Sequence, residues 1–136
     1  MARDKFHSLV RKALEKEGWK ITHDPLIVPI QISELEIDIG AEMIEATRGK
    51  SLIAVEIKSF LNKSRLHDFY KAIGQYSFYA KALSYEEPDR ELYLAIPIKA
   101  YEFLFRDPIS NEIIDEFGIR MIIYNEENGK IEQWIT

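Results

Sequence analysis

The sequence contains no cysteine. This absence excludes disulfide bonds, zinc–thiolate sites, iron–sulfur clusters and cysteine nucleophiles, so any bound metal ion must take oxygen or imidazole ligands. No apolar run approaches the roughly 20 residues that cross a bilayer, and residues 1–17 are too charged for the apolar region of a secretory signal. We therefore expect a soluble, cytoplasmic protein that has no association with membranes.

Neither a P-loop nor a GxGxxG motif occurs, so the sequence gives no support for a loop that cradles nucleotide phosphates. Internal repeats, low-complexity tracts and linkers are also missing. The 136 residues fall within the usual size of one domain, and a hydrophobic content of 46% suffices for a core. We expect residues 1–136 to form a single domain.

The formal net charge of -5 argues against a nucleic-acid interface that covers the whole surface, because such affinity comes largely from neutralising phosphates. The charge is unevenly distributed, however. Residues 48–81 contain only two acids, Glu56 and Asp68, against seven basic residues, which are Arg48, Lys50, Lys58, Lys63, Arg65, Lys71 and Lys81. A phosphate backbone can bind to such a segment, although a solvated helix face explains the same composition.

The hydrophobic pattern predicts alternating helices and strands. Apolar residues at helical spacing predict helices over 6–14 and 66–83, with shorter helical segments around 101–105 and 111–117. Strands are predicted at 19–22, 35–41, 52–60, 92–96, 119–124 and 131–135, and Pro29 makes 26–32 an edge strand or an irregular segment. This order predicts an α/β fold with a central mixed sheet flanked by helices.

Two of the predicted strands form a hairpin with a polar face. Residues 35–41 alternate between apolar and polar side chains, and residues 52–60 are the predicted antiparallel partner after a turn at 47–50. In the second strand, the side-chain period of two places Glu56 and Lys58 on one face. We expect Asp38, on the polar face of the first strand, to lie beside Glu56.

An acid and a lysine on a central strand are costly to bury without partners. Asp38 and Glu56 can compensate by holding one divalent cation, because Mg²⁺ and similar hard ions bind through a few carboxylate oxygens, retained waters and substrate phosphates. Lys58 would then stabilise negative charge that develops on a phosphate or a bound water. A plain ion pair on an exposed strand explains Glu56 and Lys58 equally well.

The arrangement of Asp38 followed by Glu56-Ile57-Lys58 resembles the PD-(D/E)XK motif of metal-dependent phosphodiesterases. The predicted helix over 66–83 carries Gln75-Tyr76-Ser77-Phe78-Tyr79, which resembles the QxxxY element of RecB-like nucleases in that superfamily. This resemblance implies a catalytic role for Gln75, with Lys71 and Tyr79 on the same helix face as substrate-binding residues. The alternative is that Tyr79 packs on the sheet and Gln75 is solvated.

Further segments of the chain fit one particular family. They are Gly18-Trp19-Lys20-Ile21-Thr22-His23-Asp24-Pro25, Asp38-Ile39-Gly40-Ala41-Glu42, Ala54-Val55-Glu56-Ile57-Lys58-Ser59-Phe60, Gly74-Gln75-Tyr76, Leu92-Tyr93-Leu94-Ala95-Ile96-Pro97 and Gln133-Trp134-Ile135. Through them almost the whole chain resembles the XisH family, named for a factor that controls excision of the fdxN DNA element in cyanobacteria. The resemblance implies a restriction-endonuclease-like fold, a role in DNA rearrangement and an XisI-like companion protein.

The chain departs from the superfamily pattern in two respects. Ile37 replaces the proline that gives the motif its name, and that proline has no chemical role. Superfamily members often add an acid from the first helix, for which Asp4, Glu15 and Glu17 are the candidates here. We expect Glu42 to be a surface carboxylate, and the three histidines, His7, His23 and His67, to be structural or solvated rather than metal ligands.

Together these features predict a metal-dependent DNA endonuclease-like factor for DNA excision, in which Asp38 and Glu56 bind Mg²⁺ or Mn²⁺. Lys58 would support the attacking water, and Gln75 would position that water or the phosphate. An alternative is a catalytically inactive nuclease-fold binding module that works with an XisI-like protein and a recombinase. A third is a purely structural ion-paired hairpin. A homodimer would suit two symmetric DNA contacts.

Overall fold

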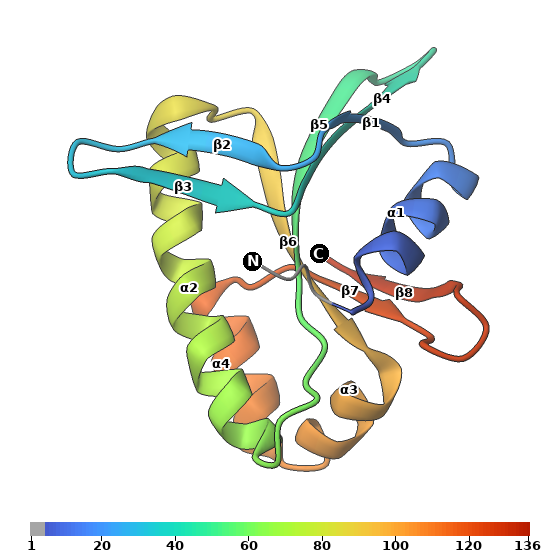
Figure 1. The fold of residues 1–136 in the computed structure, drawn as a ribbon, viewed down its shortest axis with the longest axis vertical. Helices are drawn as coiled ribbons and strands as arrows, with labels where there is room; N and C mark the ends of the chain where they lie inside the picture. The colour runs from blue at the N-terminus through green and yellow to red at the C-terminus, as the bar shows by residue number, and fades with distance from the viewer. Residues whose placement is uncertain (1–4) are drawn as a thin grey trace.

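The fold, a computed structural model that describes residues 5–136, is built on a six-stranded mixed sheet (Figure 1). Across the sheet the strand order is β1-β4-β5-β6-β7-β8, in which β5, β6 and β7 are parallel and the other neighbours are antiparallel. The elements are α1 (His7–Lys16), β1 (Lys20–His23), β2 (Leu26–Pro29), β3 (Glu34–Ile37), β4 (Ile39–Glu45), β5 (Gly49–Ile57), α2 (Arg65–Glu86), β6 (Arg90–Pro97), α3 (Ile98–Leu104), α4 (Pro108–Phe117), β7 (Met121–Tyr124) and β8 (Ile131–Ile135).

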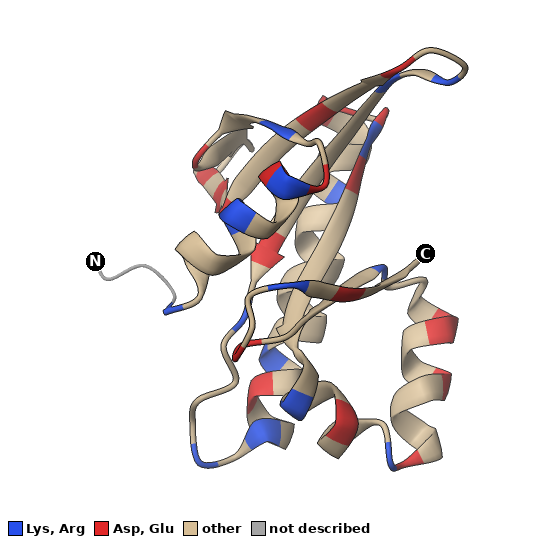
Figure 2. Ribbon diagram, turned by 90° about the vertical axis from the view of Figure 1, so that its right-hand side faces the viewer, with Lys and Arg blue, Asp and Glu red and all other residues tan. Residues whose placement is uncertain are grey.

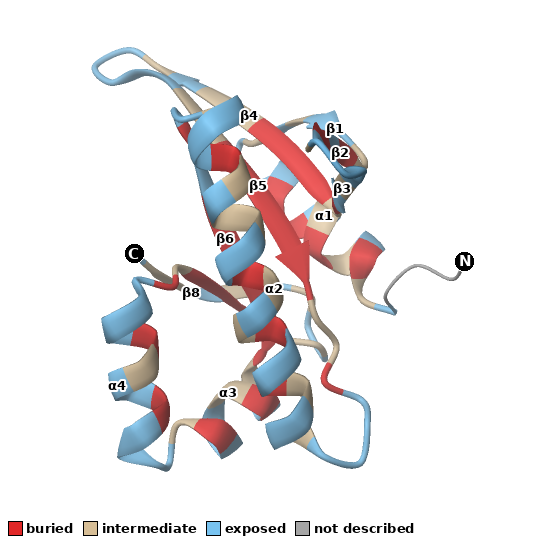
Figure 3. Cartoon of the chain, turned by 90° about the vertical axis from the view of Figure 1, so that its left-hand side faces the viewer, coloured by how far each residue is buried: buried red, intermediate tan, exposed pale blue. Residues whose placement is uncertain are grey.

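Helices cover both faces of this sheet. On one face α2, α3 and α4 pack over a core that includes Ala54 of β5 and Leu94 of β6. On the other face α1 packs over a core that includes Val55 and Ile57. Successive side chains of β5 therefore enter opposite cores, and the carboxyl-terminal half of the strand is buried throughout (Figure 3). The prediction of an α/β fold with a mixed sheet between helices is confirmed.

Several predicted elements appear with wider bounds. The long helix α2 begins after Ser64, whose hydroxyl accepts a hydrogen bond from the His67 amide, and it continues to Glu86. The segment around 111–117 is part of a ten-residue helix, α4, whose first amide groups are capped by Asp107. The strand predicted at 92–96 is the buried strand β6, and the predicted terminal hairpin is β7 and β8. None of the helices within residues 5–136 is long and apolar enough to span a membrane.

The prediction of one continuous strand over 35–41 is wrong. β3 pairs with β2 in a separate two-stranded sheet that lies across α2, whereas β4 pairs with β5 (Figure 1). Ile37 is buried in the core beneath α2, but Ile39 is buried in the core beneath α1. A continuous strand would place these two side chains on the same face, so the chain must turn over between them, at Asp38.

The predicted partner strand also ends earlier than residue 60. β5 begins at Gly49 and ends at Ile57, although the Lys58 amide still donates to the Ala95 carbonyl of β6 at 2.9 Å. Phe60 is buried with a left-handed φ of 55°, which removes it from the extended strand. The antiparallel pairing itself is confirmed, with Gly40 opposite Ala54 and Ile39 opposite Val55.

The end of the sheet where β6 begins contains a buried arginine. Arg90 is 8% exposed, and its guanidinium donates to Glu87 Oε1 and to the Ile53 carbonyl, both at 2.9 Å. The guanidinium passes over Gly40, where an added Cβ would lie 3.4 Å from Arg90 Nη1 and 3.1 Å from His23 Cβ. The glycine therefore provides the space for this charge to lie across three strands.

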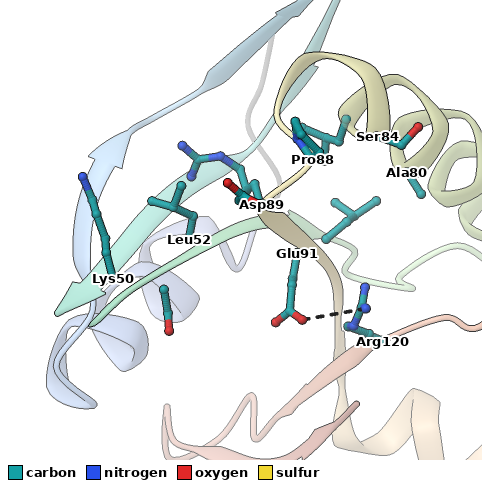
Figure 4. A pocket seen from close by; sticks show the side chains of 12 residues that line it. Lys50, Leu52, Ala80, Ser84, Pro88, Asp89, Glu91 and Arg120 are labelled. Carbon is teal, nitrogen blue, oxygen red and sulfur yellow. Dashed lines mark ion pairs between the residues drawn. The ribbon is translucent and has the colours of Figure 1, made fainter. Parts of the chain in front are cut away.

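A polar pocket of about 460 Å³ opens at the same end of the sheet (Figure 4). Lys50 and Arg120 contribute basic groups to its wall, and Arg120 Nη2 lies 3.8 Å from Glu91 Oε2. None of the predicted site residues lines this pocket.

Candidate functional site

Two segments that are distant in sequence bring Asp38 and Glu56 together. Asp38 lies in the crossover between β3 and β4, and Glu56 lies near the end of β5. Asp38 Oδ2 accepts a hydrogen bond from the Ile57 amide at 2.8 Å, and Glu56 Oε1 accepts one from the Asp38 amide at 3.3 Å. These two bonds connect the crossover to β5. The Asp38 carboxylate is held by the backbone next to Glu56, and the Glu56 carboxylate is held by the backbone of Asp38.

Lys58 lies on the same side of β5 as Glu56, as the alternation of side chains predicted. Its Nζ is 3.4 Å from Glu56 Oε2, and its side chain is 29% exposed, so the ammonium group borders solvent. The Lys58 carbonyl accepts a 2.8 Å hydrogen bond from the Tyr124 hydroxyl of β7. The backbone of the lysine is therefore held by β7, while its side chain stays partly exposed beside Glu56.

The carboxyl group of Glu56 is in an environment that disfavours its charge. It is 8% exposed, and burial, followed by the neighbouring Asp38 carboxylate, raises the pKa of Glu56 to about 8 despite the opposing effect of Lys58. One lysine therefore does not balance two carboxylates here. A further positive charge between Asp38 and Glu56 would favour the ionised form of both.

Gln75 and Tyr79 form a linked pair on α2, as their spacing predicted. Gln75 Nε2 donates to Tyr79 Oη at 2.8 Å, and Tyr79 Oη donates to the Glu36 carbonyl at 3.4 Å. The pKa of Tyr79 is raised by burial and then by the Glu56 carboxylate, so the hydroxyl of Tyr79 interacts electrostatically with the site. Its ring also packs against the core beneath α2, as the structural alternative expected, and the substrate-binding role of Tyr79 stays a prediction.

Lys71 occupies a different position from the Gln75 and Tyr79 pair. It is exposed and lines a hollow of about 190 Å³ together with Lys58 and one acid, Asp68. Within the part of the chain that the structure describes, it makes no hydrogen bond or ion pair. Lys63 lies in the loop between β5 and α2, and Figure 2 shows a basic residue on this loop.

The acids of the first helix do not complete the site. Glu15 lies 3.8 Å from Arg11, and Glu17 accepts a hydrogen bond from Trp134 at 3.0 Å. Their helix covers the face of the sheet opposite to Glu56, because Glu56 alternates with Val55 and Ile57. Asp4, the remaining candidate, lies outside the described residues. Among residues 5–136, no three acidic or histidine side chains are grouped so that they could hold a metal ion.

The other polar residues have structural partners, as expected. His7 Nε2 lies 2.8 Å from Asp24 Oδ1, and Glu42 pairs with Lys50 at 3.2 Å. His23 contacts Thr22, and His67 lies edge-on to Tyr70. These contacts of the four side chains are therefore with residues other than Asp38 and Glu56.

Two carboxylates are nevertheless a suitable donor set for Mg²⁺ or Mn²⁺. Such ions usually retain several waters and bind proteins through one or two carboxylates, with substrate phosphates completing the coordination. Asp38 and Glu56 meet this requirement. The pKa of Glu56 is raised first by burial and then by the Asp38 carboxylate, and a cation beside the two groups would favour the ionised form.

Tyr124 also belongs to this region, although no sequence motif includes it. The signal was its place in the run Met121–Tyr124, because a tyrosine in a fully buried strand needs an acceptor for its hydroxyl. The identity of that acceptor, the Lys58 carbonyl, depends on the parallel pairing of β6 with both β5 and β7.

Comparison with known proteins extends over nearly the whole chain. The family model described as XisH protein matches residues 1–132. The crystal structure of an XisH family protein from Nostoc punctiforme PCC 73102 is similar with a TM-score of 0.88 and 42% identity, covering 98% of this chain and 100% of that chain.

A second crystal structure, of an fdxN element excision controlling factor protein from Anabaena variabilis, has a TM-score of 0.88 and 43% identity, with the same coverage of 98% and 100%. A search of curated proteins gave no match. The family model and both structures agree with the resemblance seen in the sequence segments. The chain therefore belongs to the XisH family.

Proposed function

We propose that this chain is a divalent-metal-dependent, endonuclease-like factor that acts on DNA during excision of a DNA element. The observation that carries the proposal is the buried Glu56 carboxyl, held between Asp38 and Lys58 with its pKa raised to about 8. Strongly perturbed acids in such clusters are typical of active sites. The similar Anabaena variabilis protein, an fdxN element excision controlling factor, supports the excision context.

Each residue of the site has a chemical role in this proposal. Asp38 and Glu56 would hold Mg²⁺ or Mn²⁺, and the ion would supply charge stabilisation at phosphate and activation of water. Lys58, with its ammonium group at the solvent border, stabilises negative charge that develops on the scissile phosphate. The Gln75 amide, oriented by Tyr79, positions the attacking water or the phosphate.

The basic groups beside the site provide the grip on DNA. Lys71 lines the hollow that Lys58 borders, and Lys63 lies in the loop between β5 and α2. Such cations bind phosphates by releasing condensed counterions, so affinity for DNA falls as salt rises. This arrangement explains how a chain with a net charge of -5 can bind DNA through one restricted surface.

A plasmid-cleavage assay tests this function. Wild-type protein with Mg²⁺ or Mn²⁺ is expected to nick or linearise plasmid DNA, and EDTA to stop the reaction. Glu56→Gln and Lys58→Met should each lower the rate by roughly 100-fold or more, since the first removes a metal ligand and the second removes positive charge that stabilises the transition state. Glu42→Gln is the matched control, because Glu42 pairs with Lys50 outside the site. Cleavage that persists in Glu56→Gln would refute the proposal.

A second candidate function is a nuclease-fold binding module that works with an XisI-like protein and a recombinase. It is favoured by the lack of a third acidic or histidine ligand among residues 5–136. In a reconstituted excision assay, this function predicts that Lys58→Met leaves excision unchanged, while a change in the partner-binding surface abolishes it. Loss of excision in Lys58→Met with a folded protein would favour the nuclease instead.

A further inference from the structure

A long apolar groove separates α2 from α3 and α4. It encloses about 710 Å³, and neither Asp38 nor Glu56 lines it. Five large apolar side chains in its wall are substantially exposed, namely Leu66 (47%), Tyr70 (59%), Phe103 (41%), Ile109 (65%) and Phe117 (51%). Exposed turns of α2 and α4 border this region in Figure 3. Apolar side chains gathered in this way mark an interaction surface rather than scattered surface positions.

The groove continues along α2 and has the dimensions of a helix. A neighbouring hollow of about 430 Å³ is lined by Ala80, Lys81 and Ser84 of α2, and Phe117 of α4 lines both depressions. The combined surface follows α2 from Leu66 to Ser84, which corresponds to about 27 Å at 1.5 Å per residue. A helix of about five turns would match this length.

Basic residues lie at both ends of the groove. The guanidinium carbons of Arg65 and Arg106 lie 4.3 Å and 5.8 Å from the centre of the Phe103 ring, and Lys81 at the other end lies over Tyr85 at 5.9 Å. Within the described part of the chain, none of these three cations has an ion-pair partner.

Two arginines that share one aromatic ring repel each other unless an anion lies nearby. The nearest acid in sequence, Asp107, is engaged as the cap of α4, where it accepts from the Ile109 amide at 3.0 Å. The groove therefore has an apolar centre and basic residues at both ends, with one acid, Asp107, in its wall.

We propose that this groove binds an amphipathic helix of another protein, whose apolar stripe is flanked by aspartate or glutamate residues. Helix-in-groove recognition places apolar anchors at i, i+3, i+4 and i+7 against such a surface. A second copy of this chain fits less well, because its acid-rich helix, α4, already forms one wall of the groove. The proposal is independent of the metal site, since the two regions share no lining residue that binds the metal.

Selection from a phage-displayed library of helical peptides of about 18 residues tests the proposal. Peptides enriched on the wild-type protein are expected to be negatively charged and to carry apolar residues at helical spacing. Their dissociation constants, measured by fluorescence anisotropy, should rise at least about 100-fold for Ile109→Glu and about tenfold for Arg106→Glu. Ile44→Glu is the matched control, because Ile44 is 76% exposed and lies on the β4–β5 hairpin.

Three results would overturn the proposal. The first is enrichment of peptides that bind Ile109→Glu as tightly as wild type, or no enrichment at all. The second is enrichment of basic peptides, which would contradict the charge complementarity. The third is a wild-type dimer in light scattering that Ile109→Glu dissociates, which would make a second copy the occupant. Ile109 is 65% exposed, so thermal unfolding should show that Ile109→Glu and Ile44→Glu remain equally folded.

Discussion

Glu56 and Arg90 are both 8% exposed, yet the surroundings of Arg90 favour its charge and those of Glu56 disfavour its charge. Arg90 has an ion-pair partner at 2.9 Å and donates to backbone carbonyls of Ile53 and Ala41 at 2.9 Å and 3.5 Å. Glu56 has a longer contact to Lys58, at 3.4 Å, and a neighbouring carboxylate that opposes its ionisation. Arg90 is a buried charge with partners, and Glu56 is a buried charge in a costly environment.

This difference separates a structural charge, that of Arg90, from the charge that we propose to be functional, that of Glu56. Buried charges stabilise a fold only when partners compensate for lost hydration, as at Arg90. A carboxylate that remains in an unfavourable environment indicates another use for it, since active sites often retain groups that destabilise the native state. Substitution at the two positions should therefore have opposite effects on stability.

The largest expected effect is the loss of stability in Arg90→Met. This change leaves the buried carbonyl of Ile53 without its donor and Glu87 without its ion-pair partner. The free energy of unfolding, measured by urea denaturation at pH 7, should fall by roughly 3 kcal/mol. A loss below about 1 kcal/mol would mean that Arg90 is not the structural charge described above.

The next effect concerns the pH dependence of stability. Between the ordinary pKa of 4.5 and about 8, the native chain retains a proton on Glu56 that the unfolded chain releases, so the stability contributed by this group falls as pH rises. Glu56→Gln removes that dependence. At pH 9 the variant should be more stable than wild type by roughly 2 kcal/mol. This is less than the whole shift converted at about 1.4 kcal/mol per pKa unit, because relaxation and water penetration lower the cost of a buried charge. Equal pH profiles for the two proteins would contradict this expectation.

A smaller change tests the influence of Asp38 on Glu56. Asp38→Asn removes a neighbouring negative charge while keeping an oxygen that can accept from the Ile57 amide. The pKa of Glu56 should fall by about one unit, as followed by NMR titration of labelled glutamate carboxyl groups. Asp115→Asn, on α4, is the control and should leave the pKa unchanged. An unchanged Glu56 pKa in Asp38→Asn would show that burial alone raises the pKa, with no contribution from the Asp38 carboxylate.

The smallest expected effect is that of Tyr79→Phe. It removes the hydroxyl that accepts from Gln75, and should lower the free energy of unfolding by roughly 0.5–1.5 kcal/mol. Tyr85→Phe is the matched control, because Tyr85 is 79% exposed and its hydroxyl makes no hydrogen bond within the described residues. Equal unfolding free energies for both variants would show that the hydrogen bond between Gln75 and Tyr79 does not stabilise the fold.

Local patterns predicted most of the helices and strands because each has its own periodicity. The 3-4 spacing of apolar residues indicated α2, and the continuous apolar run indicated the buried strand β6. Alternation placed Glu56 and Lys58 on one side of β5, and their 3.4 Å contact agrees. The interpretation of residues 1–136 as one domain in the cytoplasm, and as a homodimer, stays a prediction.

The sequence placed Asp38 beside Glu56, but for an incorrect reason. Alternation over 35–41 is equally compatible with one strand and with two strands that meet at Asp38. Only the packing of Ile37 and Ile39 into different cores decides between them. The partners of Arg90 and the groove between α2 and α4 likewise depend on contacts between distant segments, which periodicity does not encode.

Calorimetric titration with Mn²⁺ at pH 8 tests most directly whether Asp38 and Glu56 form a metal site. Wild-type protein should bind one Mn²⁺ per chain and release protons on binding, with weaker affinity at pH 6, because the metal requires an ionised Glu56. Glu42→Gln should bind equally well, whereas Glu56→Gln should show no binding. Absence of binding by the wild type, or undiminished binding by Glu56→Gln, would contradict the assignment of this site.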